Sequence, residues 1–450
     1  MIRVRTIVTS TLLVPLVLGV SLVSAQDATS PPFNVAVTVD SVATLFSELY
    51  GPNGLIVDSL AVLPSGETHS AHFNSDFQSN FVQFGTAIAS RLVSVPLPSP
   101  ASGFTYEFDP SLGVFSRTTN SFGPILAERA DTIGGGRVSF GFAFQRFGFD
   151  TIEDLDLQNV PAVFTHDGFN LRGGRDDVVT TENSIHARVN QTTAFLTYGV
   201  TNSIDVSIGV PIINTSLTVI SAATVQRLGT ADNPAVHFFR GSDDQLGDTR
   251  LFTAFGSASG LGDITVRVNG TLSHRGPHGL GLGVDLRIPP GDERNLLGSG
   301  TAGVRPFVVW SASTPTISPH INAGYLWNGS SVLAGDVAEG ESADLADQMF
   351  YTIGADMPVG SRVTVAFDVL GRVFIDAPRV QREEFRSLNG VSTFPNIRFT
   401  NQTFTEHDGA VGIKLNIAGE LLIDFNILFR LDDNGLRDKV TPLIGIEYAL

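Results

Sequence analysis

Residues 264–288 read ITVRVNGTLSHRGPHGLGLGVDLRI, and apolar residues alternate with polar or very small ones on both sides of a turn. Ile264, Val266 and Val268 occupy every second position before the turn. After it, leucine and valine alternate with the glycines of Gly279–Gly283. Consecutive side chains of a strand point to opposite faces, so each segment has one apolar face and one polar or empty face. The stretch predicts two antiparallel strands that separate two different environments.

The same two-residue rhythm recurs along the rest of the chain. Most of the segments approach or exceed the ~9–11 residues with which a tilted strand crosses a bilayer, whereas ordinary strands average about five or six. We therefore predict an all-β fold, a closed antiparallel transmembrane β-barrel of about 12 strands (about 10–14) that occupies 137–450. The predicted strands are 137–144, 184–200, 203–210, 264–273, 279–288, 303–313, 317–327, 349–358, 361–376, 410–417, 421–430 and 439–450.

The connections between these segments alternate between long and short. Thr201-Asn202, Thr314-Pro315 and Val359-Gly360 are short, whereas 149–183 and 377–409 are long. Outer-membrane barrels have short periplasmic turns and longer external loops, with which this alternation agrees. A soluble secreted β protein has no reason to sort its loops in this way, and it remains the third alternative.

The composition excludes several function classes. Of 450 residues, 16% are charged, 32 are Phe and none is Cys. Soluble domains carry about 25% charged residues, disordered chains carry few aromatic residues, and disulfide scaffolds need Cys. The formal net charge of -17 has the wrong sign for a surface that neutralises phosphates, so we expect no nucleic-acid partner.

Residues 1–25 have the features of an export signal. Arg3 and Arg5 precede an apolar run, and Val23-Ser24-Ala25 offers apolar or small residues before a cleavage site. The alternative is a membrane-anchoring helix, but Pro15 shortens the apolar stretch below the ~20 residues that a span needs. We predict a cleaved signal peptide and a location in the outer membrane of a Gram-negative-type bacterium.

Residues 26–136 break the strand rhythm. Apolar residues recur at helical spacing in Ser41–Tyr50 and Phe77–Leu92. Such a region ahead of a barrel is either a plug within the lumen or a periplasmic appendage, and we favour the plug. Its candidate apolar contacts are Phe73, Phe77, Phe81 and Phe84.

The motifs of catalysis and cofactor binding fail their context tests. Gly298–Gly303 matches G-x-G-x-x-G, but a strand follows it where a dinucleotide site needs a helix. The nine His residues show no metal-binding spacing, and there is no G-x-S-x-G nucleophile elbow. We therefore expect no catalytic residue, no cofactor and no metal, and the protein is not expected to be an enzyme.

Charged residues fall on the polar faces of the predicted strands. On a lipid face an Arg near the midplane would cost ~2–4 kcal/mol, so we expect these residues to face the lumen. Both signs are present, which leaves internal salt bridges and contact with a solute as alternative roles. The candidate lumen-lining residues are Asp205, Arg267, Asp285, Arg287, Arg305, Arg362, Asp368, Asp424, Arg430 and Glu447.

The chain resembles the family named for the meta-pathway of phenol degradation in Tyr198–Val206, Gly260–Asp263, Leu286–Glu293 and Asn295–Gly300. The resemblance spans about 190–376. It implies an outer-membrane barrel, distantly similar to the long-chain fatty acid transporter group, that acts as an uptake or export channel. Such barrels usually end in Phe or Trp for the barrel-assembly machinery, which we expect as a partner. Here the last residue departs from that pattern, although apolar alternation persists in Ile444, Ile446, Tyr448 and Leu450.

Together these observations predict an outer-membrane channel for passive passage of small, hydrophobic or aromatic solutes. Its expected partners are outer-membrane lipid and those solutes. The alternative is a non-conducting structural or surface-interaction barrel, in which long acidic loops such as 336–347 contact other cells or envelope components.

Overall fold

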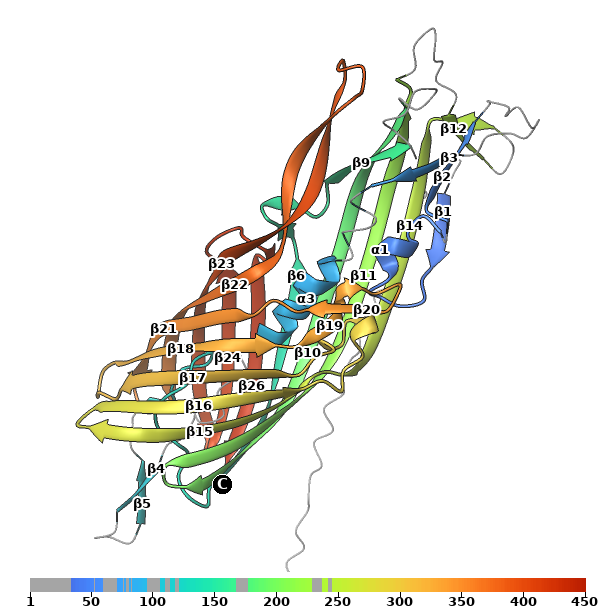
Figure 1. Cartoon of the computed structure of the whole chain (residues 1–450). Coiled ribbons are helices and arrows are strands. Elements are labelled where there is room, and N and C mark those ends of the chain that lie inside the picture. The colour runs from blue at the N-terminus through green and yellow to red at the C-terminus, as the bar shows by residue number, and fades with distance from the viewer. Residues whose placement is uncertain are drawn as a thin grey trace, which may run out of the picture.

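The computed structural model describes residues 34–51, 53–59, 71–75, 77, 81, 83–94, 106–109, 114–117, 121–166, 177–228, 237–241 and 245–450. The predicted signal peptide lies outside these residues. Within them, twelve strands pair antiparallel in sequence order, and the last pairs with the first, which closes the barrel (Figure 1). The prediction of a closed transmembrane barrel of about 12 strands is therefore confirmed. The strands are β6 (Val138–Phe149), β10 (Val178–Thr201), β11 (Ile204–Gln226), β15 (Ile264–Arg275), β16 (His278–Ile288), β17 (Gly303–Ala312), β18 (Ser318–Asn328), β21 (Gln348–Val359), β22 (Val363–Arg386), β23 (Thr393–Ala418), β24 (Leu421–Arg430) and β26 (Val440–Ala449).

The two faces of the barrel wall differ in polarity. Apolar side chains such as Phe142 and Leu282 are exposed on the outside, at 53% and 48%. Side chains on the opposite face of the same strands, such as Ser139 and Asp285, are buried on the inside. An apolar outer surface around a polar interior is the arrangement that lets a barrel meet hydrocarbon.

Aromatic residues mark the two edges of the apolar outer face. Trp310 and Tyr448 lie near the end of the barrel that carries the short turns, here called the short-turn end. Tyr325 and Trp327 lie at the opposite, long-loop end and their rings contact each other. Their positions agree with the aromatic girdles at the two interfaces of membrane barrels. Among the described residues, no helix is long and apolar enough to cross a membrane.

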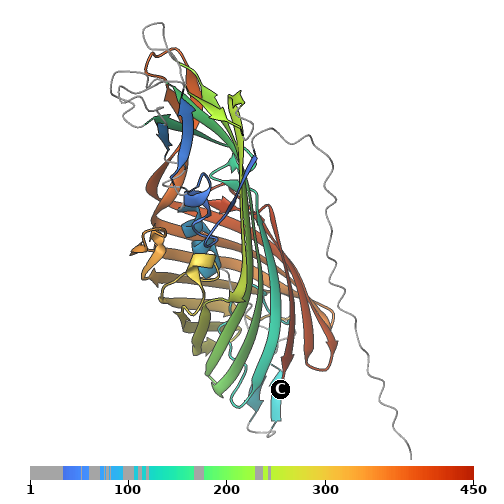
Figure 2. The same cartoon turned by 90° about the vertical axis from the view of Figure 1, so that its right-hand side faces the viewer.

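At the long-loop end some strands run well past the others. β10, β11, β22 and β23 have 24, 23, 24 and 26 residues, and β14 (Thr249–Leu261) continues the line of β15 along β11 (Figure 2). The expected long links 149–183 and 377–409 therefore contain much strand. Polar residues interrupt the alternation in these links because the strands there extend beyond the band of apolar, outward-facing side chains, which is called the apolar belt.

Shorter elements complete the described structure. A sheet beyond the belt joins the long strands to the N-terminal region, where β1 pairs parallel with β14 and β9 pairs with β10. One helix lies within Ser41–Tyr50 and another overlaps Phe77–Leu92, the two ranges that showed helical spacing. The elements are β1 (Asn34–Thr38), α1 (Leu45–Glu48), β2 (Leu55–Ser59), β3 (Ala71–Asn74), α3 (Gln83–Ser94), β4 (Tyr106–Asp109), β5 (Val114–Arg117), β7 (Thr151–Ile152), β8 (Leu155–Asp156), β9 (Val160–His166), β12 (His237–Arg240), β13 (Leu246–Gly247), η2 (Glu293–Asn295), β19 (Ser330–Asp336), β20 (Glu341–Asp344) and β25 (Leu436–Arg437).

Candidate functional site in the barrel lumen

The predicted plug phenylalanines form part of a buried apolar core at the long-loop end. Phe77, Phe81 and Phe84 are buried and surround the ring of Phe46, next to α1 and α3. Phe73 is also buried but contacts other rings, those of His166 and His237. Three of the four candidates therefore meet in one cluster, and the fourth lies beside it within the same core.

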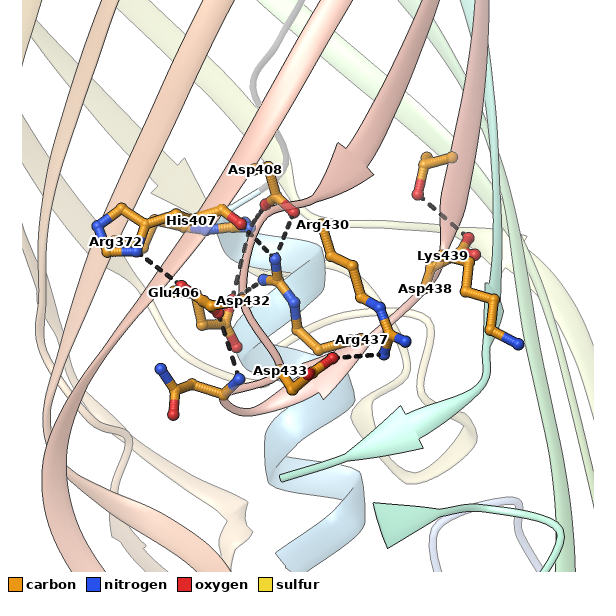
Figure 3. Close-up of polar contacts among 12 residues, drawn as sticks. Arg372, Glu406, His407, Asp408, Arg430, Asp432, Asp433, Arg437, Asp438 and Lys439 are labelled. Atoms are coloured by element: carbon orange, nitrogen blue, oxygen red, sulfur yellow. Dashed lines mark hydrogen bonds and ion pairs between the residues drawn. The ribbon is translucent and has the colours of Figure 1, made fainter. Parts of the chain in front are cut away.

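An ion cluster joins α3 to the barrel wall. Arg91 of α3 lies 3.3 Å from a carboxylate oxygen of Glu406 and 3.4 Å from one of Asp408. Arg437 lies between the same two carboxylates, as Figure 3 shows, and Arg372 also pairs with both. Burial lowers the pKa of Arg91, but the nearby Glu406 and Asp408 carboxylates raise it above its usual value. These five residues are called the α3 ion cluster below.

A second segment, residues 121–134, lies inside the barrel nearer the short-turn end and is called the lumen strap. Its backbone contacts inward-facing side chains around the wall. The side chain of Asn322 on β18 accepts from the Glu128 N–H at 2.6 Å and donates to the Glu128 carbonyl at 3.0 Å. On β11, the Asp205 carboxylate accepts a hydrogen bond from the Ile133 N–H at 2.9 Å.

Two arginine pairs fix the strap further. Arg129 of the strap lies 2.8 Å from Asp356 on β21. Glu128 of the strap forms an ion pair with Arg267 on β15, and Arg267 also binds Asp285 at 2.6 and 2.8 Å. Because these groups are buried, each charge has a partner of opposite sign, as a low-dielectric interior requires.

A cavity, called the chamber below, lies between the α3 ion cluster and the lumen strap. Its volume is about 70 Å³. One water needs about 10–15 Å³, so the chamber has room for about five waters. Its lining combines apolar and charged side chains, including Leu126, Arg305, Phe307, Gln348, Phe350 and Arg372.

The predicted lumen-lining charges fall into three groups. Asp205, Arg267, Asp285, Arg287, Asp368, Asp424 and Glu447 are buried on the inner face. Arg305 and Arg430 are partly buried, with Arg305 bound to Asp285 and Arg430 lying 3.0 Å from Asp433 at the long-loop end. Arg362 differs, because its side chain is exposed in the turn between β21 and β22.

Sequence reasoning did not identify Glu128 and Arg129 of the lumen strap, and it did not identify the residues of the α3 ion cluster. One signal did point to the strap, namely the glycines that alternate on the inner face of β16. A Cβ at Gly279 would lie 2.9 Å from the Cβ of Ala130, and one at Gly281 would lie 3.3 Å from the Ala130 Cα. The missing side chains therefore make room for the strap.

The described residues contain no group of three or more His, Asp or Glu side chains that could hold a metal ion. No curated protein sequence matches the chain.

Several solved structures are similar to this one. An outer membrane channel from Pseudomonas putida F1 has a TM-score of 0.41 and 12% sequence identity, and the match covers 72% of this chain and 99% of that one. For a Pseudomonas aeruginosa FadL homologue these values are 0.30, 10%, 78% and 94%. For the CymD monoaromatic hydrocarbon channel they are 0.26, 12%, 70% and 88%.

A family model also matches the chain, over residues 167–348, from the connection before β10 to the first residue of β21. Its description is "Putative MetA-pathway of phenol degradation". The matched region contains Tyr198–Val206 and Leu286–Glu293, which carry the resemblance seen in the sequence. The resemblance is thus confirmed, and the family to which this part of the barrel is similar is the one named for phenol degradation.

Proposed function

We propose that the protein is an outer-membrane channel through which small, hydrophobic or aromatic solutes pass without an energy source. The observation that carries the proposal is the chamber inside the barrel. A purely structural barrel needs no cavity between two segments that each close the lumen, here α3 and the lumen strap. The phenylalanine faces of the chamber wall suit an apolar ring. The match to a family named for phenol degradation supports aromatic solutes.

In this proposal the short-turn end faces the periplasm, as in other outer-membrane barrels. The described parts of residues 34–136 include both closures: α3 with its phenylalanine cluster on the outer side, and the lumen strap on the periplasmic side. The inward-facing charges line the lumen and hold these closures in place. Passage then requires the strap and α3 to move, because both are held by buried contacts.

The test is the entry of radiolabelled toluene into cells of a Gram-negative host that produce the protein. We expect faster entry than into cells that produce an unrelated barrel of equal abundance. Equal rates in the two strains would contradict the proposal.

A non-conducting structural barrel is the second candidate, and the dense ion pairs of the lumen strap favour it. Planar-bilayer recordings separate the two functions. A channel gives conductance steps that increase when the strap is loosened, whereas a sealed structural barrel gives none with either the wild type or the loosened variants.

A further inference from the structure

The chamber contains a buried hydrogen-bond donor that the protein does not use. Gln348, at the start of β21, lines the chamber and is 2% exposed. Within the described part of the chain, its Nε2 has no hydrogen-bond partner. A buried amide N–H without an acceptor is unfavourable, so the site favours an occupant that brings an acceptor atom.

A second donor lies close to Gln348 on the same wall. Gln348 pairs in register with Leu326 of β18, and Arg305 lies one strand further, on β17. Asp285 accepts from Nε and Nη2 of Arg305. Since the guanidinium is planar, its Nη1 points away from Asp285 and remains available to a second acceptor.

Aromatic faces lie beside these donors. The Arg305 guanidinium stacks 4.9 Å from the ring centroid of Phe350, and that of Arg267 stacks 5.3 Å from the ring centroid of Phe307. Both rings line the chamber. A planar apolar body therefore has surfaces to pack against within reach of the donors.

The charges that line the chamber favour an acidic rather than a basic ligand. Three arginines line it, and the two carboxylates of the lining are already paired, Glu128 with Arg267 and Asp408 with Arg372 and Arg437. No carboxylate of the lining is thus left for an ammonium group, whereas donors remain for an anion.

We propose that the chamber binds single-ring aromatic carboxylates. The ligand carboxylate accepts hydrogen bonds from Gln348 Nε2 and Arg305 Nη1, and the ring packs against Phe307 and Phe350. This inference rests on the proposed channel function and gives it a substrate class.

The test is calorimetric binding of benzoate and of benzyl alcohol to the purified full chain in detergent. We expect benzoate to bind the wild type about tenfold more tightly than benzyl alcohol. The variant Gln348→Met keeps the side-chain length but removes the donor, and should weaken benzoate binding about tenfold while changing benzyl alcohol binding less than about twofold. Gln191→Met is the matched control, because Gln191 is buried on the inner face of β10 and does not line the chamber.

Equal affinities for the two ligands in the wild type would overturn the inference, and so would equal effects of the two Met variants on benzoate binding. Toluene entry into cells reports on the channel separately. If toluene enters faster while benzoate shows no preference, the channel stands and the carboxylate site fails. If toluene entry is not accelerated, the channel itself fails, and the inference that rests on it fails too.

Discussion

Arg129 of the lumen strap lies 2.8 Å from Asp356 of β21, and the two side chains are only 1% and 0% exposed. Such a buried pair adds little net stability compared with packed apolar residues, because desolvating both charges costs about as much as their attraction returns. Its effect is to hold the strap in one position. The pair therefore connects an inward-facing charge of the wall directly to the closure of the lumen.

We expect Arg129→Met to loosen the strap and to destabilise the barrel. The substitution leaves Asp356 buried without its arginine, which costs about 3–5 kcal/mol. Planar-bilayer recordings should show more frequent or larger conductance steps, and thermal unfolding should begin at a lower temperature. The double variant Arg129→Met with Asp356→Leu removes both charges and should regain most of the stability while keeping the higher conductance. Unchanged conductance in both variants would mean that the strap does not close the lumen.

A disulfide between the strap and the wall should stop transport reversibly. The chain has no Cys, so the pair Ala130→Cys with Gly279→Cys introduces the sole thiols. A Cβ at Gly279 would lie 2.9 Å from that of Ala130, and a disulfide needs a Cβ separation of about 3.5–4.5 Å, which requires a small outward shift. We expect toluene entry to fall on oxidation and to recover on reduction, with Ala130→Cys alone insensitive to both. If toluene enters equally fast with the oxidised and the reduced forms of the double variant, solutes do not pass the strap.

Gly283 on the inner face of β16 should not tolerate a side chain. A Cβ there would lie 2.2 Å from the ring of Phe307, which also packs against Ala130 of the strap. Overpacking of this kind costs about 1–3 kcal/mol, so Gly283→Ala should lower the unfolding midpoint measured by heat-dependent electrophoretic mobility. Gly148→Ala on β6 is the control, since no atom lies within 4 Å of its added Cβ. Equal midpoints would indicate that the Phe307 ring moves aside freely.

The sequence allowed the barrel to be predicted because lipid and lumen impose opposite polarity on alternate residues, as in 279–288. It did not allow the side-chain contacts inside the lumen to be predicted. Arg129 and Asp356 are 227 residues apart, and no local pattern in 121–134 indicates which side chains on the wall its groups meet. The lengths of β22 and β23 were also underestimated, because beyond the apolar belt nothing requires their outward side chains to be apolar. The glycines of β16 did indicate where a segment packs against the inner wall, since they are empty positions on a face that has to be filled.

Leu282 tests whether the exposed apolar face lies in hydrocarbon. It sits in the middle of β16, is 48% exposed, and we expect Leu282→Arg to destabilise the barrel, since an Arg near the bilayer midplane costs about 2–4 kcal/mol. Val391, at the tip of the β22–β23 hairpin, is 83% exposed, so Val391→Arg introduces the same side chain into water at almost no cost. In lipid bilayers, the folded fraction should fall for the first variant and stay at the wild-type level for the second. In a water-soluble fold both substitutions would be tolerated alike, because each would place an arginine on a wet surface; equal folded fractions would therefore show that the outer face of β16 does not meet lipid.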